Sequence, residues 1–389
     1  MNRCKTVAVL CVSDWTYVRN ITFLRSRTAK CRRASLKETS FLSRSHATAT
    51  TQCPELDADR EAQPRAIDLA RKIQQAKINA KEPDRPLSAQ EKAVRELKQL
   101  SQQLQGVHPN VLAKYLHNSV LFQNQDVVVI NKPYGIPVRG SPGITSISSV
   151  LPVLTKMMEG MRSVSQLYPC PGLEKEMTGI LVLAKREEVV DHIVTLHKNN
   201  QVRKKMWAIT VGVPVPSEGV IDIPVIEKEV SGPRPHYKMA LSPVYRMDNS
   251  EQGVTRVRAH RQAHGAVTTY RVLDSSGGCS LVELHPLSGV KHQIRVHMAG
   301  ALACPILGDH KYSQWSKLAP QKLPEGVLRK LGLEQSKTRH LPLYLHARQL
   351  TIPGSNHQPD ICVSCPLPRY FFKTLQRLQL TLPPKEENQ

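Results

Sequence analysis

Three ionisable side chains, Glu174, Lys175 and Glu176, stand three residues before the apolar run "ILVLA" at 180–184. A carboxylate at the end of a buried strand can act as a nucleophile or accept a proton, provided that a nearby cation keeps it ionised and aimed. A charged cluster can also simply cap the strand and keep its end in water. The residue types alone leave both interpretations open.

Three further segments combine strand-like runs with polar residues. "VVVINKPYGIPV" ends its apolar run at Lys132, and Gly135 allows a tight turn after it. Lys132 could contact a phosphate or simply solvate the end of the strand. "VRKKMWAITVGV" places Met206 at the start of a second apolar run. The segment "LSGVKHQIRVHMAGALACPILGDHKY" holds Lys291, His292, Gln293, Arg295, Asp309 and Tyr312, of which we expect the last two to hold a turn.

Several familiar sites are excluded by the absence of their patterns. The chain has no GxxxxGK[ST], GxGxxG, HExxH or GxSxG motif in a context that its mechanism would need. Cys362 and Cys365 have CxxC spacing, but no second pair lies nearby, and the segment around them alternates like a strand. We therefore expect reduced structural thiols there, with a zinc site as the alternative.

The elements that position these residues follow from the hydrophobic pattern. β-Branched runs predict strands at 127–133, 180–185, 206–213, 268–274 and 279–287, and apolar spacing predicts helices at 149–158 and 186–198. Most of the strands are not joined by the regular helical crossovers of a doubly wound parallel sheet. We therefore expect an α+β fold with a largely antiparallel mixed sheet and flanking helices.

Residues 60–106 have a different character, because their helical patterns are highly charged with a thin apolar stripe. Ser88 with Glu91 three residues later forms a capping-box signature for a helix that follows. The composition favours a solvated arm or an RNA-facing extension.

The charge of the chain points to a polyanionic partner. Its 389 residues include 54 Lys and Arg against 32 Asp and Glu, a formal net charge of +22. RNA, DNA and acidic lipid all fit this excess, and a role in solubility alone is the simpler alternative. No run of about 18 apolar residues is present, so we expect no membrane span.

The first 50 residues are typical of a mitochondrial presequence, because they hold ten Lys or Arg, many Ser and Thr, and only Asp14 and Glu38 as acids. A secretory signal is the competing interpretation, since "VAVLCV" follows two basic residues. Asp14 interrupts that apolar run, and no clear small-residue cleavage site follows.

Taken in order over roughly 121–353, the four segments around Lys132, Glu174, Met206 and Arg295 resemble the RluA-type RNA pseudouridine synthases. The resemblance implies the pseudouridine synthase catalytic domain, which isomerises uridine in RNA without a metal or a cofactor. It also divides the chain into a presequence (1–50), a charged helical extension (51–111), the catalytic domain (112–380) and a tail (381–389). The family uses an Asp that an Arg holds ionised, and a Tyr against the target base.

This sequence departs from the family pattern at two of those three positions. The family motif H-R-L-D-K-x-T-S/T-G falls on 171–179, so Pro171 and Gly172 replace His and Arg, and Glu174 replaces the catalytic Asp. Met206 stands where the family has Tyr, and the neighbouring Trp207 faces the other side of a strand. Arg295 matches the family's basic residue.

The resemblance thus implies Glu174 and Arg295 as catalytic residues. We also expect a set of substrate-binding residues, either from the resemblance or from their position beside Glu174 and Arg295. They are Met206, Lys132, Lys175, Lys291, His292 and Gln293. We expect an RNA pseudouridine synthase with a divergent catalytic loop that acts on ribosomal or transfer RNA in the mitochondrial matrix. The alternative is a catalytically impaired RNA-binding paralogue that acts in mitochondrial ribosome assembly, and a role on DNA or membranes is a third possibility.

Overall fold

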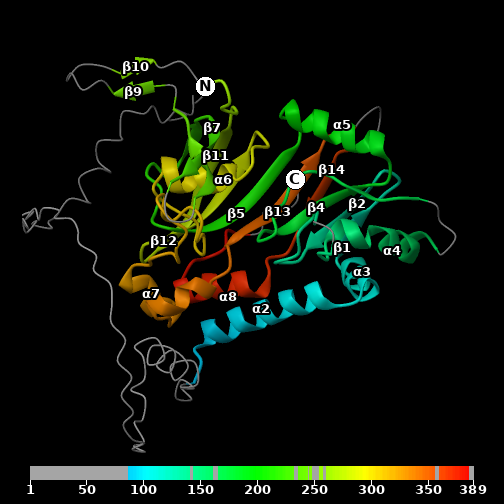
Figure 1. The fold of residues 1–389 in the computed structure, drawn as a ribbon, viewed down its shortest axis with the longest axis horizontal. Coiled ribbons are helices and arrows are strands. Elements are labelled where there is room, and N and C mark those ends of the chain that lie inside the picture. Colours follow the sequence, from blue (N-terminus) through cyan, green and yellow to red (C-terminus); the bar gives the residue numbers. More distant parts are fainter. Residues whose placement is uncertain are drawn as a thin grey trace, which may run out of the picture. The chain divides into compact units, whose positions relative to one another are not determined.

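The apolar runs of the sequence become strands of one ten-stranded mixed sheet (Figure 1). Its order is β1-β2-β4-β13-β5-β12-β11-β6, with β3 added at β4 and β14 at β13. The structure is a computed structural model that describes residues 86–140, 143–160, 165–231, 235–243, 245–247, 254–256, 260–354 and 359–384. The presequence expected at 1–50 and the first helical pattern of the extension lie outside these residues.

The strands of the structure include every strand expected from the pattern. They are β1 Val120–Gln123, β2 Val127–Lys132, β3 Tyr168–Pro169, β4 Thr178–Ala184, β5 Arg203–Val211, β6 Glu218–Asp222, β7 Val225–Val230, β8 His236–Leu241, β9 Tyr245–Met247, β10 Val254–Arg256, β11 Val267–Ser276, β12 Cys279–Pro286, β13 Leu345–Ile352 and β14 Ile361–Ser364. β7 pairs with β8 and β9 with β10 in two separate antiparallel ribbons.

The helices flank this sheet (Figure 1). They are α2 Ala89–Gly106, α3 Pro109–His117, α4 Ile147–Glu159, α5 Glu187–Lys198, α6 Gln293–Val296, α7 Glu325–Leu331 and α8 Arg369–Leu378, with a π-helical turn at His297–Ala301 and a 3-10 turn at Gln335–His340. Within the ten-stranded sheet, only β13 and β4 pair in parallel, and the other pairs are antiparallel. The α+β fold with a largely antiparallel sheet is confirmed.

β4 is buried on both faces, which explains why its sequence is a continuous apolar run. Ile180 and Val182 pack into the main core, whereas Leu181 and Leu183 pack with α3 and α4 into a second cluster on the other face. The loop that precedes β4 is therefore anchored to a strand that is packed on both faces.

α2 begins as the sequence predicts, because Ser88 caps it in a capping box with Glu91. The expectation that this helix is a solvated arm is wrong. Its Val94 and Leu104 are buried in the two cores, and the Gln90 amide donates to Tyr344 Oη (2.8 Å) and to Thr374 Oγ1 (3.1 Å). The apolar stripe that looked thin is wide enough to pack α2 against the body of the fold.

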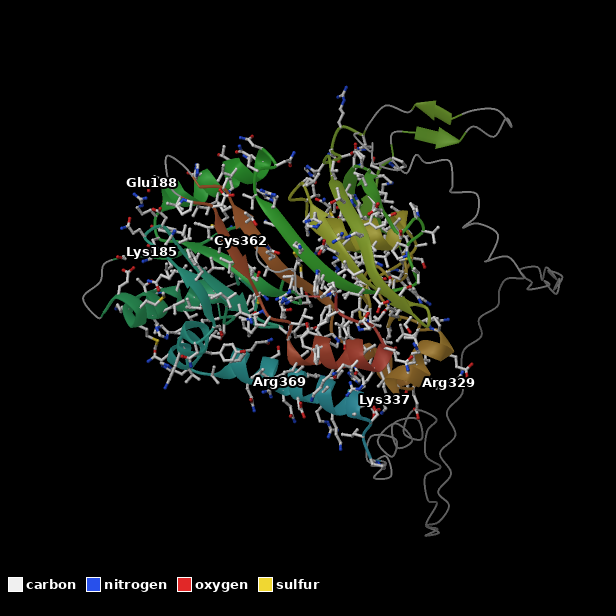
Figure 2. All side chains as sticks on the ribbon, turned by 180° about the vertical axis from the view of Figure 1, so that it is seen from behind. Lys185, Glu188, Arg329, Lys337, Cys362 and Arg369 are labelled. Atoms are coloured by element: carbon white, nitrogen blue, oxygen red, sulfur yellow. The ribbon has the colours of Figure 1, made fainter. Side chains whose placement is uncertain are left out.

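The CxxC pair lies on and just after β14. Cys362 on the strand is exposed (Figure 2), while Cys365 is buried beyond its end. Among the described residues, no group of three or more His, Cys, Asp or Glu side chains is arranged to hold a metal ion. In the same part of the chain, no helix is long and apolar enough to cross a membrane.

Candidate active site

The loop between β3 and β4 carries Glu174, and a buried lysine holds this loop from inside. Lys132, at the end of β2, has 0% of its surface exposed, and its Nζ donates to the carbonyl oxygens of Pro133 (3.0 Å), Lys175 (3.0 Å) and Met177 (2.8 Å). The backbone N–H of Gly135 also donates to the Lys175 oxygen, at 2.9 Å. The expected substrate contact of Lys132 is wrong for this structure, because its ammonium faces the protein rather than solvent.

Burial lowers the pKa of Lys132 to about 7, against the attraction of Glu176 and Glu174. An ammonium carries three hydrogens, and three carbonyl oxygens surround this one. Lys132 therefore fixes the loop backbone at Lys175 and Met177, the residues on either side of Glu176 and just after Glu174.

Arg295, on α6, lies between two carboxylates. Its Nη1 donates to Glu174 Oε2 at 2.6 Å, while its Nε and Nη2 donate to Asp309 Oδ2 and Oδ1 at 2.9 and 2.8 Å. The second interaction is a bidentate pair, which fixes the plane of the guanidinium. Glu174, although one methylene longer than the family's Asp, thus reaches the arginine directly.

Burial and neighbouring charges act on the pKa values of both Glu174 and Arg295. Burial raises the pKa of Glu174, and the charge and hydrogen bond of Arg295 oppose that rise. Burial alone would lower the pKa of Arg295, but hydrogen bonds and charges from Asp309 and Glu174 raise it well above its ordinary value. Arg295 is therefore a permanent cation beside a carboxylate that gives up its proton less readily than an exposed one.

Asp309 is the partner of Arg295 that the sequence analysis did not identify. The expectation that Asp309 holds a turn is confirmed, because its Oδ1 also accepts the backbone N–H groups of Lys311 and Tyr312, both at 3.0 Å. Its "GDHKY" context signals a turn, but nothing in the local pattern links it to an arginine 14 residues earlier.

His292 and Tyr312 lie beside Glu174 and Arg295. The Tyr312 hydroxyl accepts the Met239 N–H at 3.3 Å and lies 2.5 Å from His292 Nδ1, so its own hydrogen is free to go to that nitrogen. This leaves His292 Nε2 protonated and 3.5 Å from Glu174 Oε2. Burial, with Arg295 nearby, lowers the pKa of His292 to about 3, so the ring is neutral at pH 7.

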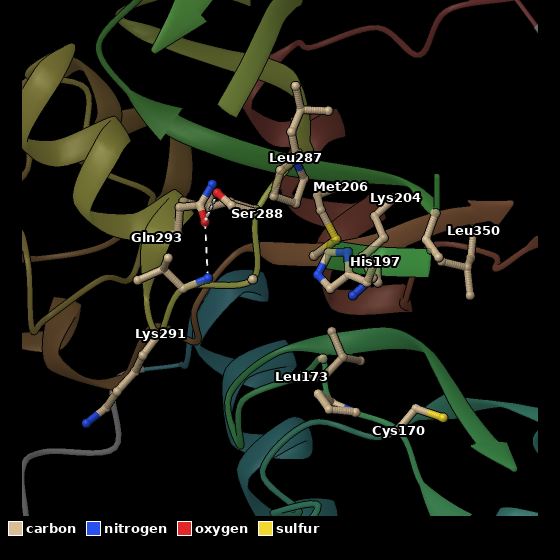
Figure 3. A pocket seen from close by; sticks show the side chains of 18 of the residues that line it. Cys170, Leu173, His197, Lys204, Met206, Leu287, Ser288, Lys291, Gln293 and Leu350 are labelled. Carbon is tan, nitrogen blue, oxygen red and sulfur yellow. Dashed lines mark hydrogen bonds between the residues drawn. The ribbon is translucent and has the colours of Figure 1, made fainter. Parts of the chain in front are cut away.

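These residues open onto a cleft of about 1080 Å³, whose wall includes Glu174, His292, Arg295 and Met206. Figure 3 shows the part of this wall around Met206. Met206 reaches the cleft from β5. Trp207 points to the opposite face, where its Nε1 donates to Glu283 at 3.2 Å, so it does not replace the family's Tyr. The cleft is large enough for a nucleotide. Where the family has a planar Tyr, β5 presents the flexible, non-aromatic side chain of Met206.

Of the remaining residues expected to bind substrate, two lysines are exposed and one glutamine is buried. Lys175 is exposed on the loop, and Lys291 is exposed at the cleft and pairs with Glu227 at 3.1 Å. Gln293 was expected to contact substrate, but it is 4% exposed and fully engaged. Its amide donates to Val267 O and Thr268 Oγ1 and accepts from Ser288 Oγ and the Val290 N–H, so its role in this structure is to hold the turn before Arg295.

Comparison with known proteins finds pseudouridylate synthases, both by family model and by similar sequences. The family model described as RNA pseudouridylate synthase matches residues 126–300. The chain is 59% identical over 326 residues to "Pseudouridylate synthase RPUSD4, mitochondrial" of Danio rerio, covering 83% of this chain and 91% of the relative. Its counterpart in Homo sapiens is 49% identical over 325 residues, covering 82% and 85%.

A more distant relative and a solved structure are also named as pseudouridine or pseudouridylate synthases. "Mitochondrial mRNA pseudouridine synthase Rpusd3" of Mus musculus is 32% identical over 290 residues, covering 69% of this chain and 80% of the relative. Among solved structures, "Human RNA Pseudouridylate Synthase Domain Containing 4" matches with a TM-score of 0.63 and 50% identity, covering 71% of this chain and 98% of that one.

Proposed function

Since this chain belongs to the RluA-type family of RNA pseudouridylate synthases, we propose that it isomerises uridine to pseudouridine in mitochondrial ribosomal or transfer RNA, with Glu174 as the reactive carboxylate. The names of the relatives, which include the word mitochondrial, support an assignment to the mitochondrial matrix. We place the catalytic domain at 112–380, with α2 packed against it.

The observation that carries the proposal is the 2.6 Å contact between Glu174 and Arg295 at the wall of the cleft. In the reaction, the bond from uracil N1 to ribose C1′ breaks, a bond from C5 to C1′ forms, and the proton on C5 is transferred while N1 gains one. A carboxylate beside the sugar and base can act as nucleophile or as proton acceptor in these steps. Arg295 keeps this carboxylate ionised, and Asp309 keeps Arg295 aimed.

The other proposed contacts follow from their positions. Met206 offers an apolar surface to a uracil ring that has left its stack, in place of a planar aromatic side chain. Lys175 and Lys291 are exposed cations beside Glu174 and at the cleft, where they can contact RNA phosphates. His292 places a neutral ring next to Glu174 without adding a charge.

The decisive experiment is to incubate the purified protein with mitochondrial ribosomal and transfer RNA and to count pseudouridine by mass spectrometry. We expect product from the wild type and a loss of roughly 1000-fold or more in rate for Glu174→Gln, which keeps the shape but removes the charge.

The matched variant is Glu174→Asp combined with Met206→Tyr, which restores the family's residues. If the wild type yields no pseudouridine while this double variant does, the proposal is refuted in favour of an RNA-binding paralogue that has lost catalysis.

A further inference from the structure

Lys204 is a cation of β5 that faces the cleft. Side chains alternate along a strand, so Lys204 points to the same side as Met206, and both line the cleft (Figure 3). Lys205 and Trp207 point to the other side, where Lys205 Nζ lies 3.5 Å from Glu283 Oε2. The two adjacent lysines therefore have different surroundings.

Lys204 is the lysine without a neutralising partner. Within the part of the chain that the structure describes, its Nζ forms no hydrogen bond or ion pair, whereas Glu283 is shared by Lys205, Arg271 and His285. Burial lowers the pKa of Lys204, and Cys170 opposes this shift without reversing it. A partly buried cation that faces a cavity without a counter-charge is a candidate for binding an anion.

Lys204 lies beside the loop that carries Glu174. A Cβ atom placed on Gly172, two residues before Glu174, would lie 3.9 Å from Lys204 Nζ. The absence of a side chain at Gly172 leaves the space in front of this ammonium open. The cation and the carboxylate thus belong to the same cleft, separated by a short stretch of one loop.

His197, on α5, adds a hydrogen-bonding group to the same wall. Its Nδ1 is buried and has no hydrogen-bond partner among the described residues. Burial, with the charge of Lys204, lowers the pKa of His197 to about 4, so the ring is neutral at pH 7. Figure 3 shows its ring next to Lys204 and Met206. A Cβ atom on Gly289 would lie 2.9 Å from His197 Nε2, so glycine at that position leaves room for the ring.

We propose that Lys204 and His197 form an anion subsite that binds a phosphate of the RNA strand next to the target uridine. The subsite rests on the proposed function, because it takes its ligand to be RNA. A phosphate there supplies the missing counter-charge of Lys204 and accepts an N–H of the neutral imidazole. The cleft, at about 1080 Å³, exceeds the usual volume for a single small ligand, so it has room for a neighbouring nucleotide.

The test compares Lys204→Ala with Lys205→Ala, which removes the same charge from the adjacent, outward position. Affinity for a twelve-nucleotide oligouridylate is measured by fluorescence anisotropy across a series of salt concentrations. We expect Lys204→Ala to weaken binding about tenfold or more and to reduce the slope of log affinity against log salt by roughly 0.7, because one phosphate contact is lost. Lys205→Ala should stay within about twofold of the wild type.

Two further measurements show whether the contact is to phosphate. Against the same oligonucleotide with neutral methylphosphonate linkages, the wild type and Lys204→Ala should bind equally, and Lys204→Arg should recover most of the affinity for the natural form. His197→Ala should weaken binding of the natural form as well. Thermal unfolding of each variant confirms that it is folded before its affinity is compared.

Equal binding by the Lys204 and Lys205 variants would overturn the subsite, as would a difference that persists on the neutral oligonucleotide. Both outcomes are independent of turnover. If the wild type makes no pseudouridine, the proposed function fails, but the binding comparison still decides whether the subsite exists.

Discussion

Arg295 is shared by two carboxylates whose exposure differs sharply. The side chain of Asp309 is 1% exposed, whereas that of Glu174 is 25% exposed and lies on the cleft. The buried partner fixes the guanidinium, and the exposed one remains available to a substrate. This division of roles is the residue-scale feature on which the proposed chemistry depends.

Replacing Asp309 by Asn tests this division directly. The variant keeps the shape but leaves Arg295 with a single carboxylate, so we expect about 3–5 kcal/mol less stability, as for a broken buried ion pair. Rate should fall by roughly 10- to 100-fold while RNA affinity changes little, because Asp309 does not line the cleft. Urea unfolding and single-turnover assays measure the two effects, and an unchanged rate in a folded variant would contradict the role given to Asp309.

The raised pKa of Glu174 predicts how activity depends on pH. The reaction needs the carboxylate, so the rate should fall toward acid at a pH higher than the value near 4.5 of an ordinary glutamate. A pH–rate profile of single turnovers measures the midpoint of this fall. A midpoint at or below that of an exposed glutamate would contradict the burial argument.

The raised pKa of Glu174 also predicts how the free energy of unfolding changes with pH. Because the folded pKa lies above the unfolded one, the unfolded chain releases the proton first as pH rises, and folding loses stability between the two values. Glu174→Gln should therefore be slightly more stable than the wild type at pH 7. The difference should disappear below the unfolded pKa, which urea unfolding at several pH values can measure.

At the scale of elements, the loop 170–177 is held by segments that lie far apart in the sequence, around Lys132 and Arg295. β4 and the Arg295 segment were predictable, because an apolar run and an intact motif mark them. The function of Lys132 was not predictable, because the same residue at a strand end fits solvation, a phosphate contact or a buried bond to carbonyl groups. Gln293 and α2 were misjudged for a related reason, since polar side chains that satisfy buried backbone groups look like surface residues in a sequence.

Replacing Lys132 by Met tests whether the loop depends on the buried ammonium. Three carbonyl oxygens would lose a donor, so we expect a loss of stability of about 3 kcal/mol or more and a fall in rate of roughly 100-fold as Glu174 moves. RNA affinity should change little, because Lys132 is fully buried. The matched variant is Lys175→Met on the same loop, which should weaken RNA binding but leave stability nearly unchanged. If Lys132→Met instead weakened RNA binding and left stability unchanged, Lys132 would be an RNA contact after all.

At the scale of the whole molecule, the sheet consists of two halves that meet at β13. Glu174 precedes β4 in one half, whereas Met206 and Arg295 belong to the other, and β13 pairs with β4 on one side and β5 on the other. A contact between Thr178 Oγ1 and His346 Nδ1 at 2.9 Å lies on this junction. The site therefore spans the two halves that β13 joins.

Gly179→Ala tests this junction. Gly179 has φ of +106°, and a Cβ atom there would lie 2.3 Å from the carbonyl oxygen of Ala347 on β13. We expect the variant to lose about 3 kcal/mol or more of stability and most activity, because β13 cannot pair closely with β4. Urea unfolding measures the loss. Gly106→Ala, at a position with no atom within 4 Å, is the control and should be close to neutral.

The place of β13 also determines when during synthesis the two halves of the sheet can pair. β4 is complete at residue 184 and β5 at 211, but the strand that joins them spans Leu345–Ile352. A ribosome adds residues in order, so the two halves have both been made well before the strand between them emerges. Until then, β4 and β5 have no partner in common, and the apolar surface that β13 covers stays open to solvent or to other chains.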